Sequence, residues 1–191
     1  MIDKILQLDR ELLIFLNSLG SESFDSFWLT ITNQFTWTPL FLLVLFFVFK
    51  EFGLKKGIFT FLFIVVLVAF SDQFTNLIKN TTERLRPCNT ESLQGYLRQF
   101  TYKPRGFSFW SGHASLSTAF SVFVFLLFKS RIKYIKWIFI FPIVFGLSRI
   151  YLGVHYPLDV TCGYIAGIIV GFIFYKFYRK LFLSNQTFKF F

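Results

Sequence analysis

Long apolar stretches alternate with short polar segments along the chain after about residue 36. Five of these stretches have about the 17–25 residues that a helix needs to cross a bilayer. They cover approximately residues 37–52, 56–79, 111–129, 133–150 and 157–178. The first is short, which fits a tilted helix or one that begins before Trp37. The pattern predicts an all-α fold, a polytopic transmembrane bundle with about five spanning helices, in a single domain of residues 1–191.

The N-terminal segment has a different pattern. Residues 3–17 place leucine and isoleucine side chains on one broad stripe, and Asp9 interrupts that stripe. This is typical of an amphipathic helix that lies in the membrane interface. Small and polar residues at 18–23 end the helix, and residues 24–34 form either a second short helix or a re-entrant segment. Residues 1–34 are therefore predicted to be interfacial or re-entrant.

Basic residues indicate the orientation of the predicted bundle, because lysine and arginine are enriched in cytoplasmic loops. They follow the first, third and fifth apolar stretches. The residues are Lys50, Lys55, Lys56, Lys129, Arg131, Lys133, Lys136, Lys176, Arg179, Lys180 and Lys189. Residues 1–34 and the 80–108 loop are then extracytoplasmic. That loop is expected to be a lid or headgroup site with aromatic anchors at Tyr96, Phe100, Tyr102 and Phe107.

Composition supports a membrane protein and argues against other classes. Of the 191 residues, 54% are hydrophobic and 31 are Phe, which is more apolar surface than a water-soluble domain of this size carries. The net charge of +10 would suggest nucleic acid in a soluble protein, but basic helix ends explain it better here. Cys88 and Cys162 lack metal or redox spacing, and no disulfide is expected because Cys162 lies inside a predicted helix and Cys88 in a loop. The charged first ten residues do not fit a signal peptide, so the first spanning helix is expected to direct insertion.

Three polar clusters lie at predicted helix ends on the extracytoplasmic side. In the first, Asp72, Asn76, Lys79, Glu83 and Arg86 follow a helical spacing, and Pro87 comes next. If the helix continues that far, they form one stripe facing the bundle interior, where charges are tolerated. Lysine and arginine are good phosphate ligands. The simpler alternative is that Lys79 and Arg86 only reach toward the interface.

The second cluster is Ser111-Gly112-His113, a short motif with little specificity by itself. Its position at the start of the third apolar stretch places Ser111 where a helix N-cap is expected. Free N–H groups at a helix start bind anions, and Gly112 allows close approach of the backbone. His113 would then lie near a bound phosphate and could act as a general acid.

The third cluster joins Ser148-Arg149 to His155, Pro157 and Asp159. Proline is common at the first position of a helix, which places His155 just before the last helix and Asp159 in its first turn. A carboxylate that accepts one imidazole N–H leaves the other nitrogen nucleophilic. The alternative is a purely structural His–Asp pair. Small residues follow at every fourth position and predict tight helix packing, at Gly163, Gly167 and Gly171.

These clusters resemble the three-part signature of the type 2 phosphatidic acid phosphatases, the lipid phosphate phosphatase family. The signature is Lys, six residues, Arg-Pro; then Pro-Ser-Gly-His; then Ser-Arg, five residues, His, three residues, Asp. The first and third parts match fully, and Trp110 replaces the proline of the second. The resemblance covers about residues 72–163 and extends to the active site of vanadium-dependent haloperoxidases.

The resemblance implies a role for each matching residue. His155 would attack phosphorus, Asp159 would orient it, and His113 would protonate the leaving oxygen and then activate water. The phosphate-binding residues would be Lys79, Arg86, Arg149, Ser111 and Gly112, with Ser148 beside them. Neither a metal nor another cofactor is expected, and vanadate should inhibit.

The resulting hypothesis is a bacterial inner-membrane, multi-pass lipid phosphatase with an extracytoplasmic active site and a phosphohistidine intermediate. Undecaprenyl diphosphate is the first substrate choice, and phosphatidylglycerol phosphate, phosphatidic acid and lipid A phosphates are alternatives. Its partners are the lipid substrate and the bilayer, not nucleic acid. A non-catalytic binder or transporter is the hypothesis of another class, disfavoured because binding alone does not need His113, His155 and Asp159. A vanadate-dependent oxidant enzyme fits poorly with five membrane spans.

Overall fold

The computed structural model describes residues 1–184 as helices joined by turns and loops, with no strand in that range. The predicted all-α class is thus confirmed, while Lys189 lies outside the described residues. The α-helices of the structure are α1 (Ile2–Ser18), α2 (Glu22–Thr32), α3 (Thr38–Thr82), α4 (Gly112–Phe128), α5 (Ile140–Tyr151) and α6 (Pro157–Ser184). Single 3-10 turns are η1 (Gln34–Trp37), η2 (Pro87–Asn89), η3 (Glu91–Leu93) and η4 (Ile135–Phe139).

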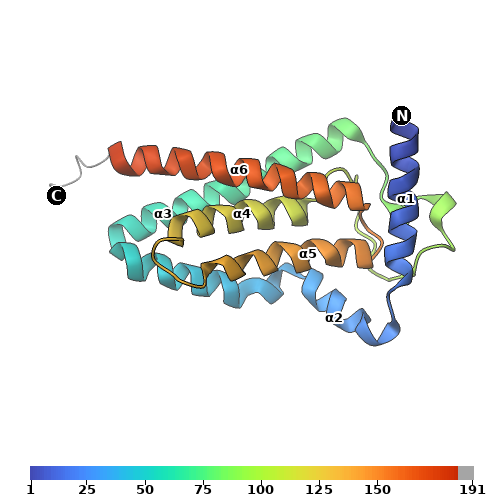
Figure 1. Cartoon of the computed structure of the whole chain (residues 1–191), viewed down its shortest axis with the longest axis horizontal. Helices are drawn as coiled ribbons and strands as arrows, with labels where there is room; N and C mark the ends of the chain where they lie inside the picture. The colour runs from blue at the N-terminus through green and yellow to red at the C-terminus, as the bar shows by residue number, and fades with distance from the viewer. Residues whose placement is uncertain (185–191) are drawn as a thin grey trace.

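Helix α3 contains two of the predicted apolar helices. Gly53 interrupts it with φ 68° and ψ −177°, a conformation that is essentially restricted to glycine. The chain turns back there, so the two arms of α3 run side by side in opposite directions (Figure 1). Each of the five predicted apolar stretches therefore contains a helix of the bundle.

The contact between α4 and α6 lies at the centre of the bundle. A Cβ at Gly163, Gly167 or Gly171 would come within 2.7, 2.5 or 2.6 Å of a backbone carbonyl oxygen of Ser111, Ser115 or Ala119. Only glycine allows the helices to approach this closely. The predicted packing role of the glycine stripe is confirmed, and the stripe brings the first turn of α6 against the start of α4.

Helices α1 and α2 lie at one end of the bundle (Figure 1). Helix α1 crosses the end of α5 and α6 and buries Leu13 and Asn17 completely. The Asn17 amide donates to the carbonyl of Tyr151 at 2.7 Å and accepts from the backbone N–H of Arg98 at 2.8 Å. The open question about residues 24–34 is answered by α2, a regular helix that stacks Trp28 on Tyr151 at 5.1 Å.

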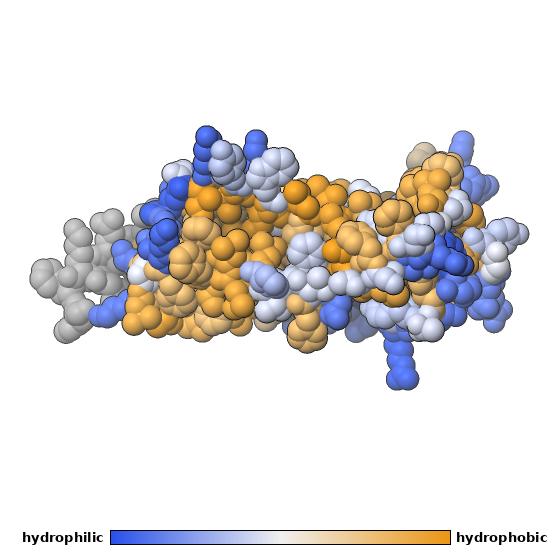
Figure 2. Space-filling model, turned by 90° about the horizontal axis from the view of Figure 1, so that it is seen from below, coloured by the Kyte–Doolittle hydropathy of each residue, from blue (hydrophilic) through white to orange (hydrophobic). Residues whose placement is uncertain are grey.

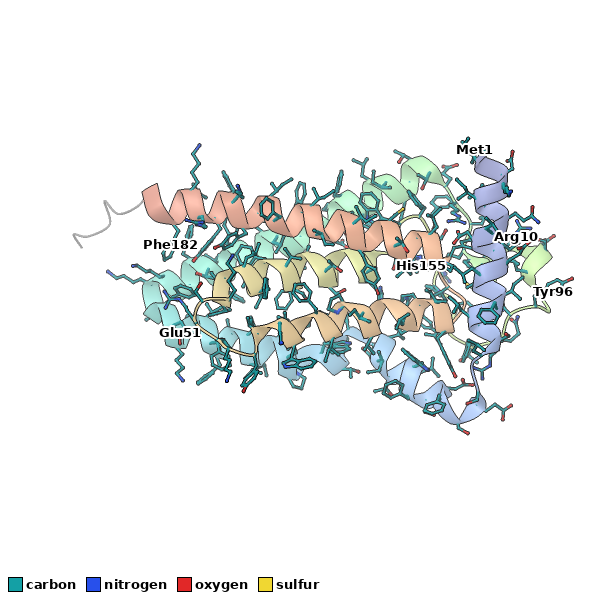
Figure 3. The ribbon with its side chains drawn as sticks, viewed as in Figure 1. Met1, Arg10, Glu51, Tyr96, His155 and Phe182 are labelled. Carbon is teal, nitrogen blue, oxygen red and sulfur yellow. The ribbon has the colours of Figure 1, made fainter. Side chains whose placement is uncertain are left out.

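The surface has an apolar region between two hydrophilic ends (Figure 2). Gln34–Thr82 and Pro157–Phe182 are long and apolar enough to cross a membrane, and Gly112–Phe128 is a shorter apolar helix. The predicted basic loops around Lys55 and Lys133 share the end that carries Glu51 and Phe182, opposite α1 (Figures 1 and 3).

The polar stripe on α3 is shorter than the five spaced residues allow. It would include Glu83 and Arg86 only if the helix continued that far, and α3 ends at Thr82. Glu83 takes a left-handed conformation with φ 47° and is exposed, and Arg86 has an extended backbone. Asp72, Asn76 and Lys79 remain on the helix, and the chain enters the bundle again at Arg86 by a different route.

Candidate functional site

Residues of all three sequence clusters meet at the bundle end beneath α1. Lys79 lies in the last turn of α3 and Arg86 in the segment that follows it. His113 begins α4, Arg149 lies in the last turn of α5, and Asp159 lies in the first turn of α6. His155 lies in the α5–α6 turn, inside this end of the bundle (Figure 3).

His155 and Asp159 form a buried pair. The Nδ1 atom of His155 is 3.4 Å from Oδ2 of Asp159, and both side chains are at most 1% exposed. The same Oδ2 accepts the backbone N–H of Tyr156 at 2.9 Å, which fixes the carboxylate at the helix start. If Nδ1 carries the proton toward Asp159, Nε2 presents a lone pair on the opposite side of the ring. There Nε2 lies 3.1 Å from Nη1 of Arg86.

Arg86 and Arg149 are buried cations without a carboxylate partner in residues 1–184. Arg86 donates to the carbonyls of Gly106 and Val154, each at 3.2 Å. Arg149 donates to the hydroxyls of Thr32 and Tyr102, and its Nε has no partner within the described chain. Two uncompensated buried guanidinium groups are costly for folding. This arrangement is suited to binding an anion that supplies the missing negative charge.

A groove of about 680 Å³ is lined by residues of both arms of α3, of α4 and of α5, and most of its lining is apolar. Lys79, Gly112 and His113 are among the residues that line it. The His113 ring packs on Phe145 with 4.4 Å between ring centroids. His113 is also close enough to Arg149, His155 and Lys79 for their charges to act on it.

The two serines of the motifs have helix partners. Ser111 is the predicted N-cap of α4, and its hydroxyl accepts the N–H of Ala114 at 3.5 Å. The Ser148 hydroxyl donates to the carbonyl of Phe145 at 2.6 Å, within its own helix. Ser148 therefore directs its proton away from the cations, and its proposed place beside a phosphate stays a prediction.

Trp110 takes the place of the proline that the family signature has before Ser-Gly-His. Its indole N–H donates to the hydroxyl of Thr75 at 3.1 Å, and its ring packs edge-on against Phe74. Trp110 thereby connects the segment before α4 to the last turns of α3, where Lys79 lies. The substitution replaces a stiff residue with a side-chain contact that also holds this segment in place.

Sequence reasoning did not identify Arg84 and Asp9 as part of the site. Arg84 donates to Asp159 Oδ1 at 2.6 Å and to Asp9 Oδ2 at 2.7 Å. The sequence feature that could have indicated this contact was Asp9 itself, an acidic residue on the apolar stripe of α1. A carboxylate in that position requires a buried partner once the helix packs.

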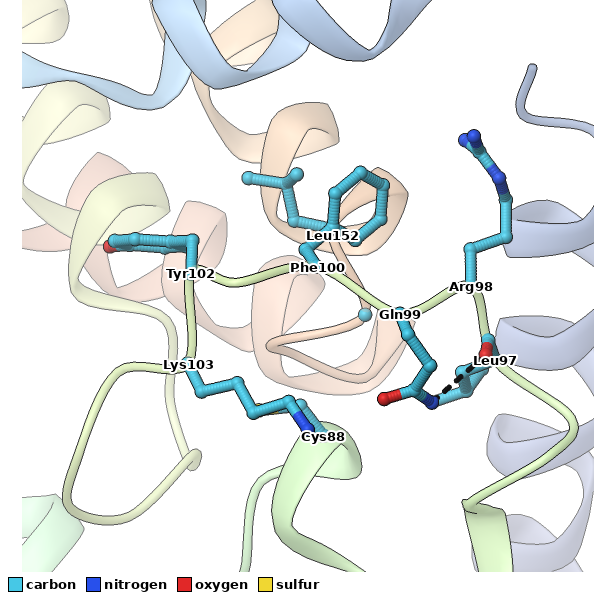
Figure 4. A pocket seen from close by; sticks show the side chains of 9 residues that line it. Cys88, Leu97, Arg98, Gln99, Phe100, Tyr102, Lys103 and Leu152 are labelled. Carbon is cyan, nitrogen blue, oxygen red and sulfur yellow. Dashed lines mark hydrogen bonds between the residues drawn. The ribbon is translucent and has the colours of Figure 1, made fainter. Parts of the chain in front are cut away.

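The 80–108 loop packs on the turn before His155. A cavity of about 10 Å³, too small for a substrate, lies between residues 97–103, Cys88 and Leu152 (Figure 4). Phe100 packs near Tyr151, while Tyr96 is exposed and Tyr102 reaches Arg149. Cys88 and Cys162 are free thiols, as predicted. Burial raises the pKa of the Cys88 thiol, although the nearby Arg86 charge opposes this.

Burial and positive charge together determine the protonation state of His155. Burial, followed by the charges of Arg149, Arg86 and Lys79, holds the pKa of His155 well below its ordinary value of 6.5. The ring is therefore neutral at physiological pH, as a nucleophile must be. In residues 1–184 no group of three or more His, Cys, Asp or Glu side chains is placed to hold a metal ion, and metal independence stays a prediction.

Comparisons with known proteins agree with this arrangement. A family profile described as the PAP2 superfamily matches residues 57–183. The chain is 32% identical, over 98% of its length and 84% of the relative, to a lipid A 4'-phosphatase of Bacteroides thetaiotaomicron. It is 30% identical, over 74% of its length and 63% of the relative, to an undecaprenyl-diphosphatase of Sulfolobus acidocaldarius. The fold matches the crystal structure of a transmembrane PAP2-type phosphatidylglycerolphosphate phosphatase from Bacillus subtilis, with a TM-score of 0.69. The match covers 93% of this chain and 87% of that chain, at 19% sequence identity.

Proposed function

The chain belongs to the PAP2 superfamily and is a membrane lipid phosphatase, and from this premise we propose that it removes a phosphate from an acylated sugar lipid of the lipid A type. The observation that carries the chemistry is the pair of buried guanidinium groups, Arg86 and Arg149, beside His155 and Asp159. They supply positive charge where a phosphoryl group gains negative charge in the transition state.

The proposed reaction has two steps. The Nε2 lone pair of His155 attacks phosphorus, and the P–O bond to the lipid breaks as the leaving oxygen takes a proton from His113. A water molecule then gives a proton to His113 and cleaves the P–N bond, which releases phosphate and restores both histidines. Asp159 holds the Nδ1 proton throughout, and Lys79, Arg86 and Arg149 bind the phosphoryl oxygens.

The groove supports a lipid substrate, because its mostly apolar lining also includes Lys79 and His113. It also contains one polar pair, in which the Asn76 amide donates to the Asp72 carboxylate at 3.1 Å. Both residues line the groove on the same arm of α3 as Lys79. An acylated amino sugar has amide and hydroxyl groups that can bond with this pair, while an isoprenoid chain has none. This favours a lipid A-type substrate.

Undecaprenyl diphosphate, the first choice from sequence, becomes the second candidate. Its support is the 30% identity to an undecaprenyl-diphosphatase, which extends over less of the chain than the similarity to the lipid A 4'-phosphatase. Phosphatidylglycerol phosphate and phosphatidic acid fit the cations equally well. The first offers one glycerol hydroxyl to the Asp72–Asn76 pair, the second has neither an amide nor an alcohol hydroxyl, and both offer less than an acylated amino sugar. The non-catalytic binder or transporter has no need of the His155–Asp159 pair.

We further propose that the bundle crosses the bacterial inner membrane five times and places the site on the extracytoplasmic face. The basic loops lie at the bundle end opposite the site, which supports this orientation. A cysteine accessibility assay on intact cells would test it. In a protein that carries Cys88→Ser and Cys162→Ser, Tyr96→Cys at an exposed position should react with an impermeant reagent, and Lys133→Cys should not.

The first test is phosphate release in detergent micelles with a chelator present. The substrates are lipid A phosphate, undecaprenyl diphosphate, phosphatidylglycerol phosphate and phosphatidic acid, and the enzymes are the wild type and His155→Ala. We expect fastest release from lipid A phosphate and none by the variant. The variant Asn76→Leu should lose activity on lipid A phosphate but not on undecaprenyl diphosphate. An equal loss on both would contradict the role of the polar pair, and release by His155→Ala would contradict the nucleophile.

A further inference from the structure

Arg84 is shared between two carboxylates that are far apart in sequence. One end of its guanidinium donates to Asp159 at 2.6 Å and the other to Asp9 at 2.7 Å. The group also lies over the ring of Tyr156, the residue after His155, at 3.8 Å from the ring centroid. Arg84 therefore contacts Asp159, whose carboxylate faces His155, and Tyr156, which follows His155 in the chain.

Asp9 attaches the N-terminal helix to this arrangement. Its side chain is 5% exposed, and its second oxygen accepts the backbone N–H of Leu158 at 2.8 Å. Leu158 is the second residue of α6, so Asp9 binds the start of the helix that carries Asp159. A single carboxylate of α1 thus holds Arg84 and the first turn of α6 together.

Resting on the function proposed above, we propose that Asp9 and Arg84 are positioning residues for the nucleophile. The chain Asp9–Arg84–Asp159 fixes the Asp159 carboxylate against Nδ1 of His155 and balances the charge around the imidazole. Without Arg84, the buried carboxylates of Asp9 and Asp159 would lose the cation that they share. Without Asp9, Asp159 alone would offset the charge of Arg84, in a site that already contains three cations.

The charged groups around the His155–Asp159 pair come from several elements. Asp159 of α6 faces His155, Asp9 of α1 acts through its ion pair with Arg84, and the remaining groups are cations or a second imidazole. They are Lys79 of α3, Arg84 and Arg86 of the following segment, His113 of α4 and Arg149 of α5. Removing Asp9's charge makes this surrounding more positive, and removing Arg84's charge makes it more negative. The two changes should shift the pKa of His155 in opposite directions, by about 1 unit each.

The opposite shifts can be measured without turnover. The chain has two histidines, so ¹⁵N-histidine labelling gives a spectrum of two imidazoles, and His113→Gln assigns them. Arg84→Gln should raise the pKa of His155 toward its ordinary range, and Asp9→Asn should lower it. Arg84→Lys keeps the charge and should stay near the wild-type value. Glu11→Gln, an isosteric change at an exposed position of α1, is the matched control and should change nothing.

Kinetics supply the second readout. Asp9→Asn and Arg84→Gln should each lower kcat about tenfold, the scale of coupling within one ion-pair network. KM should change little, because Lys79, Arg86 and Arg149 remain. Shifts of the His155 pKa in the same direction, or none in either folded variant, would overturn the positioning role. Opposite shifts in a protein that releases no phosphate from any lipid would support the positioning and contradict the proposed function instead.

Discussion

Two groups of arginines lie at the same end of the bundle, and they differ in their partners. Arg84 and Arg98 bind carboxylates: Arg84 binds Asp9 and Asp159, and Arg98 binds Asp25 at 2.8 Å. Arg86 and Arg149 are more deeply buried and bind only neutral groups within residues 1–184. The first pair connects helices and loops, while the second is left with positive charge, which the proposed function assigns to phosphate binding. The position of an arginine in a membrane-protein site therefore says less about its role than its partners do.

The largest difference should come from removing one uncompensated cation. Arg149→Met should lower kcat/KM about 10³-fold, because a preorganised donor to the phosphoryl group is lost. The free energy of unfolding should stay the same or increase, because an uncompensated buried charge opposes folding. Phosphate release and thermal unfolding in detergent would measure the two effects. A strongly destabilised variant would place Arg149 among the structural arginines.

The matched change in the other group is Arg98→Met, and we expect the reverse pattern. The variant loses bonds to Asp25 and to the hydroxyl of Tyr151, which connect the 97–103 segment with α2 and α5. The free energy of unfolding should fall by about 2 kcal/mol, since both bonds involve a charged group. The kcat/KM of the folded fraction should be nearly unchanged. A large loss of kcat/KM at full stability would contradict the division into two groups.

A smaller effect concerns pH. Burial and the neighbouring cations lower the pKa of folded His155 below 6.5, so the unfolded chain binds more protons once the pH falls under that value. Stability from this group is complete above pH 6.5 and is lost on acidification, at about 1.4 kcal/mol per pH unit until the folded pKa is reached. His155→Asn should therefore show a weaker decrease of unfolding temperature between pH 7.5 and 5.5. Equal decreases in both proteins would show that folding does not lower the pKa of His155.

The helices and the residue types of the site could be predicted from the chain, and particular contacts could not. The spacing of Pro157, His155 and Asp159 correctly predicted the start of α6, because proline at the first position and a carboxylate in the first turn are local preferences. The predicted stretch ended at about residue 79, close to the observed end of α3 at Thr82. The sequence left open whether the helix continues to Arg86, since nothing in the local pattern requires the left-handed conformation of Glu83. The role of Trp110 became clear only from its bond to Thr75, 35 positions away.

Residue patterns alone predicted the apolar helices, the close packing of α6 through its glycines, and which residue types gather at one end. Those features depend on periodicity and on local helix chemistry, which short segments express without the rest of the fold. Only the folded arrangement shows which arginines are compensated and which are not. Asp9 reaches Arg84 from the first helix, and no carboxylate reaches Arg86 or Arg149 in residues 1–184. The physical reason is that charge compensation depends on distances of a few ångströms between segments that sequence spacing does not relate.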